Sequence, residues 1–143
     1  MAIIRTGSAE WSGGIRDGRG KISTESGALA AYPYGFASRF EGQRGSNPEE
    51  LLGAAHAACF TMALSLVLGE AGLTATRLST SAKVSLDKTD AGYTITRVDL
   101  VLEGEVPGAT PEQFAELAGT AKANCPLSRV IRAEITLDAS LAQ

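Results

Sequence analysis

The chain has 143 residues, the usual size of one domain, and we expect residues 1–143 to form a single domain. Hydrophobic residues make up 44% of it and charged residues 20%, a composition that excludes a disordered chain. The formal net charge is −3 and no segment concentrates Lys and Arg, so we expect neither nucleic acid nor an anionic membrane as a partner. The N-terminus lacks the layout of a signal peptide, which favours a cytoplasmic location.

The first forty or so residues have the pattern of short strands separated by turns. Polar and apolar residues alternate from Ile4 up to Trp11, and glycines at positions 13, 14 and 18 indicate turns. Residues 34–40 are expected to form another extended segment.

A clear helix-start signal follows this region. Asn47 is a favourable N-cap, Pro48 suits the first helical position, and Glu50 at the third position can complete a capping box. We expect the helix to cover residues 48–70, with Gly72 just beyond its end.

Two strands are expected next, joined by a turn at residues 90–92. Polar and apolar residues alternate over residues 77–87, so one face of this strand is apolar. The next strand covers residues 93–106, and its alternation slips by one position in the middle. That slip predicts a β-bulge near Thr96 and Arg97.

The remaining segments are two helices followed by one strand. Thr110 is the N-cap of a second helix over residues 111–124, and Cys125 looks like the N-cap of a short helix over residues 126–132. A last strand over residues 135–141 has one apolar face. Strands and helices in separate blocks, joined partly by hairpins, predict an α+β fold.

The first helix is apolar on every side. From residue 51 to 68 its sequence is LLGAAHAACFTMALSLVL, in which only His56, Thr61 and Ser65 are polar. Its length admits a membrane span, but the many alanines and the lack of flanking basic residues favour burial in a protein core. The helix would be about 35 Å long, too long for one thin sheet to cover. We therefore expect an obligate two-fold homodimer in which two such helices pack together.

The two cysteines have different local settings. Cys59 lies in an apolar helix, which raises the pKa of a thiol, whereas Cys125 lies at a helix start, which lowers it. Local rules alone make Cys125 the nucleophile, and Cys59 can take that role only if the fold brings a cation to it. Two inert buried thiols are the plain alternative. His56 and Cys59 supply at most half a zinc site, so we expect no metal.

The run NPEELLGAAHAACF, residues 47–60, resembles the signature of the OsmC/Ohr peroxidases. Further segments resemble the osmotically inducible OsmC branch: STESG (23–27), PYGF (33–36), RFEG (39–42), Cys125-Pro126 and AEITLD (133–138). The resemblance spans nearly the whole chain. It implies an intertwined homodimer with long buried central helices packed against antiparallel sheets, in agreement with the burial argument.

The resemblance also implies an activity, the reduction of organic hydroperoxides and, less well, of hydrogen peroxide, without a cofactor. By motif position it makes Cys59 the peroxidatic cysteine, Cys125 the resolving one, Glu49 the motif carboxylate and Arg39 the catalytic arginine. Arg16, in a glycine-rich N-terminal segment, is the alternative arginine. Oxidation would form a Cys59–Cys125 disulfide, which a dithiol donor, a lipoylated or thioredoxin-like protein, would reopen.

Spacing adds one expectation about subunits. Glu49 and Cys59 are ten residues apart, about 15 Å along one helix, so Glu49 cannot reach the thiol of its own chain. If Glu49 orients the active-site arginine, the simplest geometry brings it from the partner subunit. Plain structural interpretations stand beside these roles: Arg39 as a surface residue, His56 as a hydrogen-bonded helix residue, and Met62 as part of the core together with Phe36, Phe40 and Phe60. The alternative for some of these last four side chains is that they line an apolar substrate pocket. The alternative function is a non-catalytic dimer that binds an apolar ligand and senses oxidation through Cys59.

Overall fold

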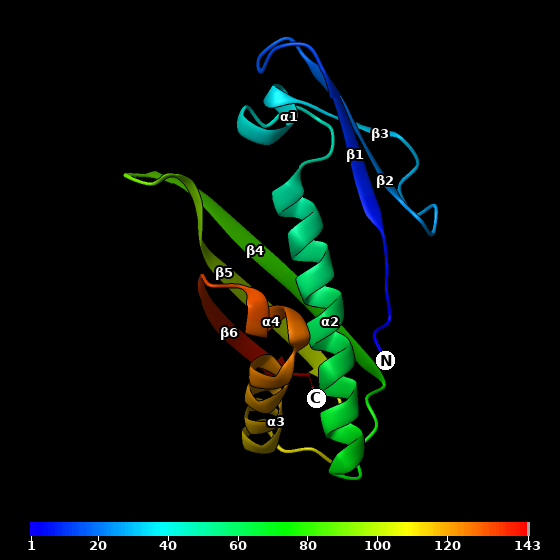
Figure 1. The fold of residues 1–143 in the computed structure, drawn as a ribbon. Helices are drawn as coiled ribbons and strands as arrows, with labels where there is room; N and C mark the ends of the chain where they lie inside the picture. Colours follow the sequence, from blue (N-terminus) through cyan, green and yellow to red (C-terminus); the bar gives the residue numbers. More distant parts are fainter. Residues whose placement is uncertain (143) are drawn as a thin grey trace. The chain divides into compact units, whose positions relative to one another are not determined.

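The computed structural model describes residues 1–142 (Figure 1). The chain divides into two compact units, Met1–Leu51 and Leu52–Gln143, and each is described by itself. The predicted α+β class is confirmed, since each unit combines a three-stranded sheet with helices. The prediction of a single domain remains a prediction.

The first unit begins with an antiparallel sheet of β1 (Gly7–Ser12), β2 (Arg19–Thr24) and β3 (Tyr32–Tyr34) in that order. Register places Gly20 between Trp11 on one side and Tyr34 on the other. A Cβ atom added to Gly20 would lie 2.3 Å from the Tyr34 ring, so the glycine lets that ring lie flat on β2.

A short helix, α1 (Phe36–Phe40), follows β3 directly. The sequence prediction of an extended segment over residues 34–40 is therefore wrong beyond Tyr34. The Ser38 hydroxyl accepts a hydrogen bond from the Gly35 amide at 3.0 Å and donates one to the Ser46 carbonyl at 2.8 Å. These local bonds fix one turn of helix, which is too short to produce a periodic pattern in the sequence.

The long helix α2 (Pro48–Glu70) has the predicted bounds. The Asn47 side-chain oxygen accepts a hydrogen bond from the Glu50 amide at 2.8 Å, as expected of an N-cap. At the other end Gly72 adopts a positive φ of 77°, and the Leu73 amide donates to the Leu68 carbonyl at 2.8 Å. A glycine in the left-handed region thus ends the helix.

The second unit contains a sheet with the order β4 (Arg77–Thr89), β5 (Gly92–Glu105), β6 (Glu134–Leu141). The register of β4 and β5 shifts so that Thr96 has no partner, which confirms the predicted bulge. β6 pairs parallel to β5 and so differs from the antiparallel sheets that we expected. The intervening α3 (Pro111–Asn124) and α4 (Pro126–Val130) carry the chain back to the start of β5, and a parallel pair needs such a crossover.

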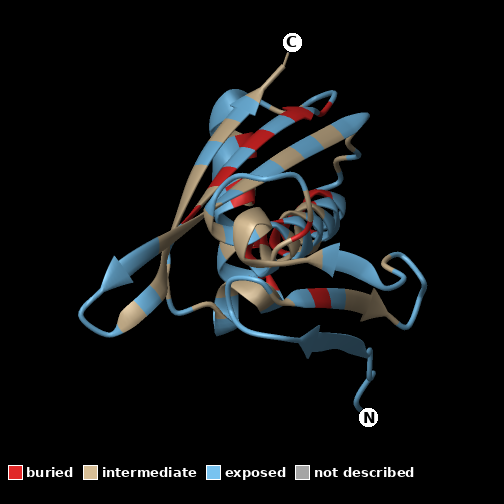
Figure 2. Ribbon diagram, turned by 90° about the horizontal axis from the view of Figure 1, so that it is seen from above, coloured by how far each residue is buried: buried red, intermediate tan, exposed pale blue. Residues whose placement is uncertain are grey.

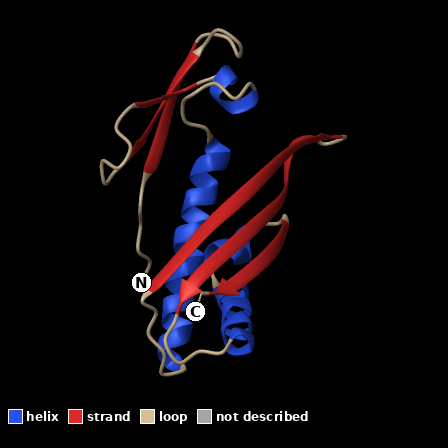
Figure 3. Ribbon diagram, turned by 180° about the vertical axis from the view of Figure 1, so that it is seen from behind, coloured by secondary structure: helices blue, strands red, loops and turns tan. Residues whose placement is uncertain are grey.

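The core of the second unit lies between its sheet and its helices. Figure 3 shows α3 and the second-unit part of α2 on the same side of the sheet. Figure 2 shows buried residues recurring along the central strand, β5. Three elements contribute fully or almost fully buried side chains to this core: Phe60, Leu64 and Leu68 from α2, Val98, Leu100 and Leu102 from β5, and Phe114, Ala118 and Ala121 from α3. Gly53 allows a close approach, because a Cβ there would lie 3.0 Å from the Ala82 carbonyl oxygen.

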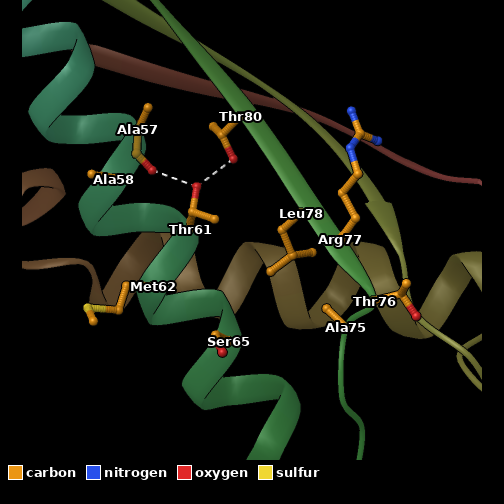
Figure 4. Close-up of a pocket in the computed structure, with 10 residues that line it drawn as sticks. All are labelled: Ala57, Ala58, Thr61, Met62, Ser65, Ala75, Thr76, Arg77, Leu78 and Thr80. Atoms are coloured by element: carbon orange, nitrogen blue, oxygen red, sulfur yellow. Dashed lines mark hydrogen bonds between the residues drawn. The ribbon is translucent and has the colours of Figure 1, made fainter.

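Another side of α2 has no cover among the described residues. Ala54, Ala58, Met62 and Leu66 are exposed and lie on one stripe of the helix, with Met62 at 77% and Leu66 at 66%. The prediction that Met62 belongs to the core is thus wrong for the single chain. Beside this stripe an open groove runs between α2 and the start of β4 (Figure 4). There the Thr61 hydroxyl hydrogen-bonds the Ala57 carbonyl at 2.6 Å and the Thr80 hydroxyl at 2.7 Å.

By length and composition, α2 could also cross a membrane. The mean hydropathy of its most apolar window is 1.9, and 33% of that window is buried. The core helix of a globular protein passes the same test, and Phe60, Leu64 and Leu68 lie in the core. This face of α2 is therefore part of the core of the second unit.

Candidate active site

Arg39 and Glu49 form a bidentate ion pair in the first unit. Arg39 lies in the last turn of α1 and Glu49 in the first turn of α2. The arginine Nη2 lies 2.7 Å from Glu49 Oε1, and its Nε donates to both carboxylate oxygens at 3.1 and 3.3 Å. The Arg39 side chain is 37% exposed and that of Glu49 is 11% exposed. A largely buried carboxylate thus fixes the plane of a guanidinium that still reaches the surface.

Aromatic side chains form a cup around Arg39. The hollow is lined by Trp11, Ile15, Tyr34, Phe36, Arg39 and Phe40. The rings of Phe36 and Phe40 lie 4.9 Å apart, and the Arg39 guanidinium carbon lies 5.3 Å from the centre of the Phe40 ring. The cup therefore combines an apolar wall with one oriented cation.

The alternative arginine, Arg16, makes a different contact. Its guanidinium carbon lies 4.6 Å from the centre of the Phe36 ring. Arg16 forms no ion pair with an acidic side chain among residues 1–142. Of the two candidates, Arg39 is thus the one whose orientation a carboxylate fixes.

Both predicted cysteines lie together in the second unit. Cys59 is in the middle of α2 and Cys125 immediately precedes α4, and both thiols are free. Cys125 is fully buried in the core and Cys59 is partly buried against it. The two thiols are close enough that each one shifts the pKa of the other. Cys59 and Cys125, which are 66 positions apart in the sequence, are thus adjacent in the fold. Two cysteines must be adjacent in this way to form a disulfide.

The two thiols hold their protons differently. Burial raises the pKa of Cys59, and the hydrogen bond to Cys125 and the charge of Cys125 raise it further, against a smaller lowering by the Leu127 amide. Burial also raises the pKa of Cys125, but hydrogen bonds from the Ser128 amide, the Cys59 side chain and the Ser128 hydroxyl outweigh it and lower the pKa overall. Within the second unit, Cys125 is therefore the thiol that loses its proton more readily.

His56 lies one turn before Cys59 and is fully buried. Its Nε2 atom lies 2.8 Å from the Ser128 hydroxyl oxygen, so the interpretation as a hydrogen-bonded helix residue is confirmed. Burial lowers the pKa of His56, which keeps the imidazole neutral. Among the described residues no three His, Cys, Asp or Glu side chains gather as metal ligands.

The structure thus brings the four predicted site residues together as two pairs, one in each unit. Sequence reasoning missed Ser128, whose hydroxyl is hydrogen-bonded to His56. No local pattern marks Ser128, because this partner lies 72 positions away in the sequence.

Residues 40–140 match the family described as OsmC-like protein. The chain is 57% identical over 141 residues to peroxiredoxin OsmC of Escherichia coli, covering 99% of each chain. It is 29% identical over 128 residues to the organic hydroperoxide resistance protein OhrB of Bacillus subtilis, covering 88% of this chain and 92% of OhrB.

Solved structures agree with this assignment. The crystal structure of an organic hydroperoxide resistance protein from Elizabethkingia anophelis, 26% identical, superposes with a TM-score of 0.71 over 100% of this chain and 99% of that one. Sequence and fold both lead to one conclusion: the chain belongs to the OsmC family.

Proposed function

We propose that this protein reduces organic hydroperoxides with Cys59 as the peroxidatic and Cys125 as the resolving cysteine. A cysteine-based peroxidase is the enzyme class indicated by the relative named peroxiredoxin OsmC, and the substrate class follows the name of OhrB. The observation that carries the proposal is the contact between two free thiols from distant parts of the chain.

In the first step, the Cys59 thiolate attacks one peroxide oxygen and the O–O bond breaks. The other oxygen leaves as an alkoxide and takes a proton to become an alcohol, while Cys59 becomes a sulfenic acid. The Cys125 thiolate then attacks the Cys59 sulfur, the S–O bond breaks, and hydroxide leaves to become water. A dithiol donor returns two electrons and restores both thiols.

Arg39 is the cation that we assign to Cys59. A guanidinium beside Cys59 lowers the pKa of its thiol and reverses the order of protonation that the second unit has by itself. Glu49 occupies Nε and Nη2 of Arg39, so we assign the Nη1 hydrogens to the peroxide oxygens. A fixed donor pair of this kind stabilises the negative charge that develops on the leaving oxygen.

We further propose that the active enzyme is a homodimer with composite sites. The exposed stripe of α2 (Ala54, Ala58, Met62 and Leu66) is an apolar surface that a second copy can cover. A two-fold axis that packs the two α2 helices antiparallel brings the start of one helix beside the middle of the other. Arg39 and Glu49 of one subunit then serve Cys59 of the other.

The aromatic cup suits an organic substrate. Trp11, Tyr34 and Phe36 offer apolar surface next to Arg39, and burial of an alkyl group contributes roughly 25 cal/mol per Å². Hydrogen peroxide has no alkyl group and gains nothing from this surface. We therefore expect organic hydroperoxides to be preferred.

A lipoylated or thioredoxin-like protein is the proposed dithiol donor, and the cytoplasm is the proposed location. Two thiols that must return to the reduced form after each cycle suit a reducing compartment.

Steady-state consumption of cumene hydroperoxide with a dithiol present tests the proposal. The enzyme should consume many equivalents, and Cys59→Ser should consume none. A binding protein that only senses oxidation would react once per subunit and stop. Consumption of a single equivalent despite excess dithiol would therefore overturn the proposed function in favour of the sensor.

A further inference from the structure

We propose that Arg19 and Arg44, in a hollow beside the aromatic cup, form an anion subsite that binds the carboxylate of an acidic organic hydroperoxide. The subsite rests on the proposed function and deepens it, because it selects, among organic hydroperoxides, those that carry a carboxylate. Arg39 binds the peroxide group, and Arg19 and Arg44 bind the other end of the same molecule.

The hollow lies in the first unit and has a volume of about 310 Å³. Its charged lining consists of Arg16, Arg19 and Arg44, and among the described residues no Asp or Glu lines it. The Arg16 guanidinium is stacked on the Phe36 ring, 4.6 Å from its centre. Arg19 and Arg44 are exposed and form no ion pair with an acidic side chain within residues 1–142. The hollow therefore has two guanidinium groups whose charge no carboxylate of the chain neutralises.

Arg19 is the first residue of β2 and lies between two glycines that pack against rings of the cup. A Cβ atom added to Gly18 would lie 2.8 Å from a ring carbon of Trp11, and one added to Gly20 would lie 2.3 Å from the Tyr34 ring. No side chain fits at such distances, so the two glycines let both rings lie against the backbone of this segment. The backbone on either side of Arg19 is thus in direct contact with the wall of the cup.

Arg44 lies in the loop between α1 and α2, and backbone hydrogen bonds hold this loop on both sides of the arginine. The Gln43 amide donates to the Ala37 carbonyl at 3.1 Å, and the Ser46 amide donates to the Pro33 carbonyl at 3.3 Å. These bonds attach the loop to α1 on one side and to β3 on the other. Arg44 therefore extends from a fixed backbone position at the edge of the hollow.

The hollow and the cup share a wall. Tyr34, Gly35 and Phe36 line both of them, and Arg39 lines the cup only. Apolar surface thus lies between the cation that we assign to the peroxide and the guanidinium groups of the hollow. A molecule with a hydroperoxide at one end, an alkyl chain in the middle and a carboxylate at the other end has its groups in the same order. Guanidinium groups suit a carboxylate because their N–H groups can bind its two oxygens in parallel.

The kinetic test compares two substrates that differ in charge, ω-hydroperoxydecanoic acid and its methyl ester. Wild-type enzyme should have a higher kcat/KM for the acid than for the ester. The double variant Arg19→Gln/Arg44→Gln should lower the ratio of these two kcat/KM values roughly threefold to tenfold, since exposed ion pairs are individually weak. The matched control is Arg5→Gln/Lys21→Gln, which removes two positive charges from exposed side chains of the same unit that do not line the hollow. It should keep the wild-type ratio.

Calorimetric binding of decanoate, which has the carboxylate but no peroxide, completes the test without any turnover. Arg19→Gln/Arg44→Gln should bind decanoate more weakly than wild type and the control variant do. If no hydroperoxide were consumed at all, the proposed function would fail, while weaker decanoate binding in this variant would still support the subsite. The subsite would be overturned if the variant kept the wild-type preference for the acid, or if the control variant lost that preference to the same extent.

Discussion

The thiol pair and the guanidinium–carboxylate pair have opposite surroundings. Cys125 is fully buried in an apolar core, and Cys59 is held protonated there by burial and by its neighbour. Arg39 is 37% exposed, and Glu49 fixes its orientation within an aromatic cup. Among the described residues, no cation contributes to the pKa of either thiol, and the oriented cation lies in the other unit. The proposed reaction therefore requires groups from both units.

The largest expected effect separates the roles of the two thiols. Cys59→Ser should abolish reaction with hydroperoxide, whereas Cys125→Ser should keep one fast turnover and then accumulate sulfenic or sulfinic acid on Cys59. Mass spectrometry after one equivalent of peroxide distinguishes these products. The reverse pattern, with activity kept in Cys59→Ser, would mean that the local pKa order decides the chemistry and that no cation reaches Cys59.

The next effect concerns the arginine. Arg39→Ala should lower kcat/KM for cumene hydroperoxide by a factor on the order of 10²–10³, because it removes both the cation and the peroxide donors. Arg16→Ala is the matched control and should change kcat/KM little, since Arg16 stacks on Phe36 without a carboxylate partner. If kcat/KM fell further in Arg16→Ala than in Arg39→Ala, Arg16 would be the active-site arginine.

A smaller effect is expected in the aromatic cup. Wild-type enzyme should have a higher kcat/KM for cumene hydroperoxide than for hydrogen peroxide. Trp11→Ala removes apolar surface from the cup and should lower the ratio of these two kcat/KM values several-fold. Tyr32→Ala removes an exposed ring that does not line the cup and should leave the ratio unchanged. Equal losses for both substrates in Trp11→Ala would mean that the ring only supports the fold.

The smallest effect is on stability and concerns the buried imidazole of His56 in the second unit. Burial lowers the pKa of His56 from 6.5, so below that pH the unfolded chain binds more protons than the folded one. The free energy of unfolding should therefore decrease as the pH is lowered below 6.5. This group contributes at most about 1.4 kcal/mol per pH unit to that decrease. Urea denaturation at about pH 7.5 and about pH 5.5 should show a larger loss in wild type than in His56→Gln. Equal losses of unfolding free energy in the two proteins would mean that the pKa of His56 is the same in the folded and the unfolded chain.

Local signals predicted one part of the molecule well. The bounds of α2 follow from Asn47, Pro48 and Gly72, whose effects act within one helical turn. The bulge at Thr96 follows from a slip in alternation that is visible in one strand. Features of this kind can be predicted from neighbouring residues alone.

Other features depend on contacts that no local pattern records. The parallel pairing of β6 is set by the path of α3 and α4, and α1 is too short to have a period. The sequence motif indicated Cys59 and Cys125 but not Ser128, whose importance comes from its contact with His56, 72 positions away. The exposure of Met62 belongs to the same class, since burial depends on what covers α2.

Subunit mixing of two inactive variants, Glu49→Ala and Cys59→Ser, tests the composite site most directly. In a mixed dimer, the Glu49→Ala chain keeps its Cys59 and its partner keeps Glu49. If the carboxylate acts across the interface, one of the two symmetric sites is intact and about half of the wild-type activity per mixed dimer returns. If the mixture stays as inactive as its parents despite verified subunit exchange, Glu49 does not serve the partner's thiol and the composite site is wrong.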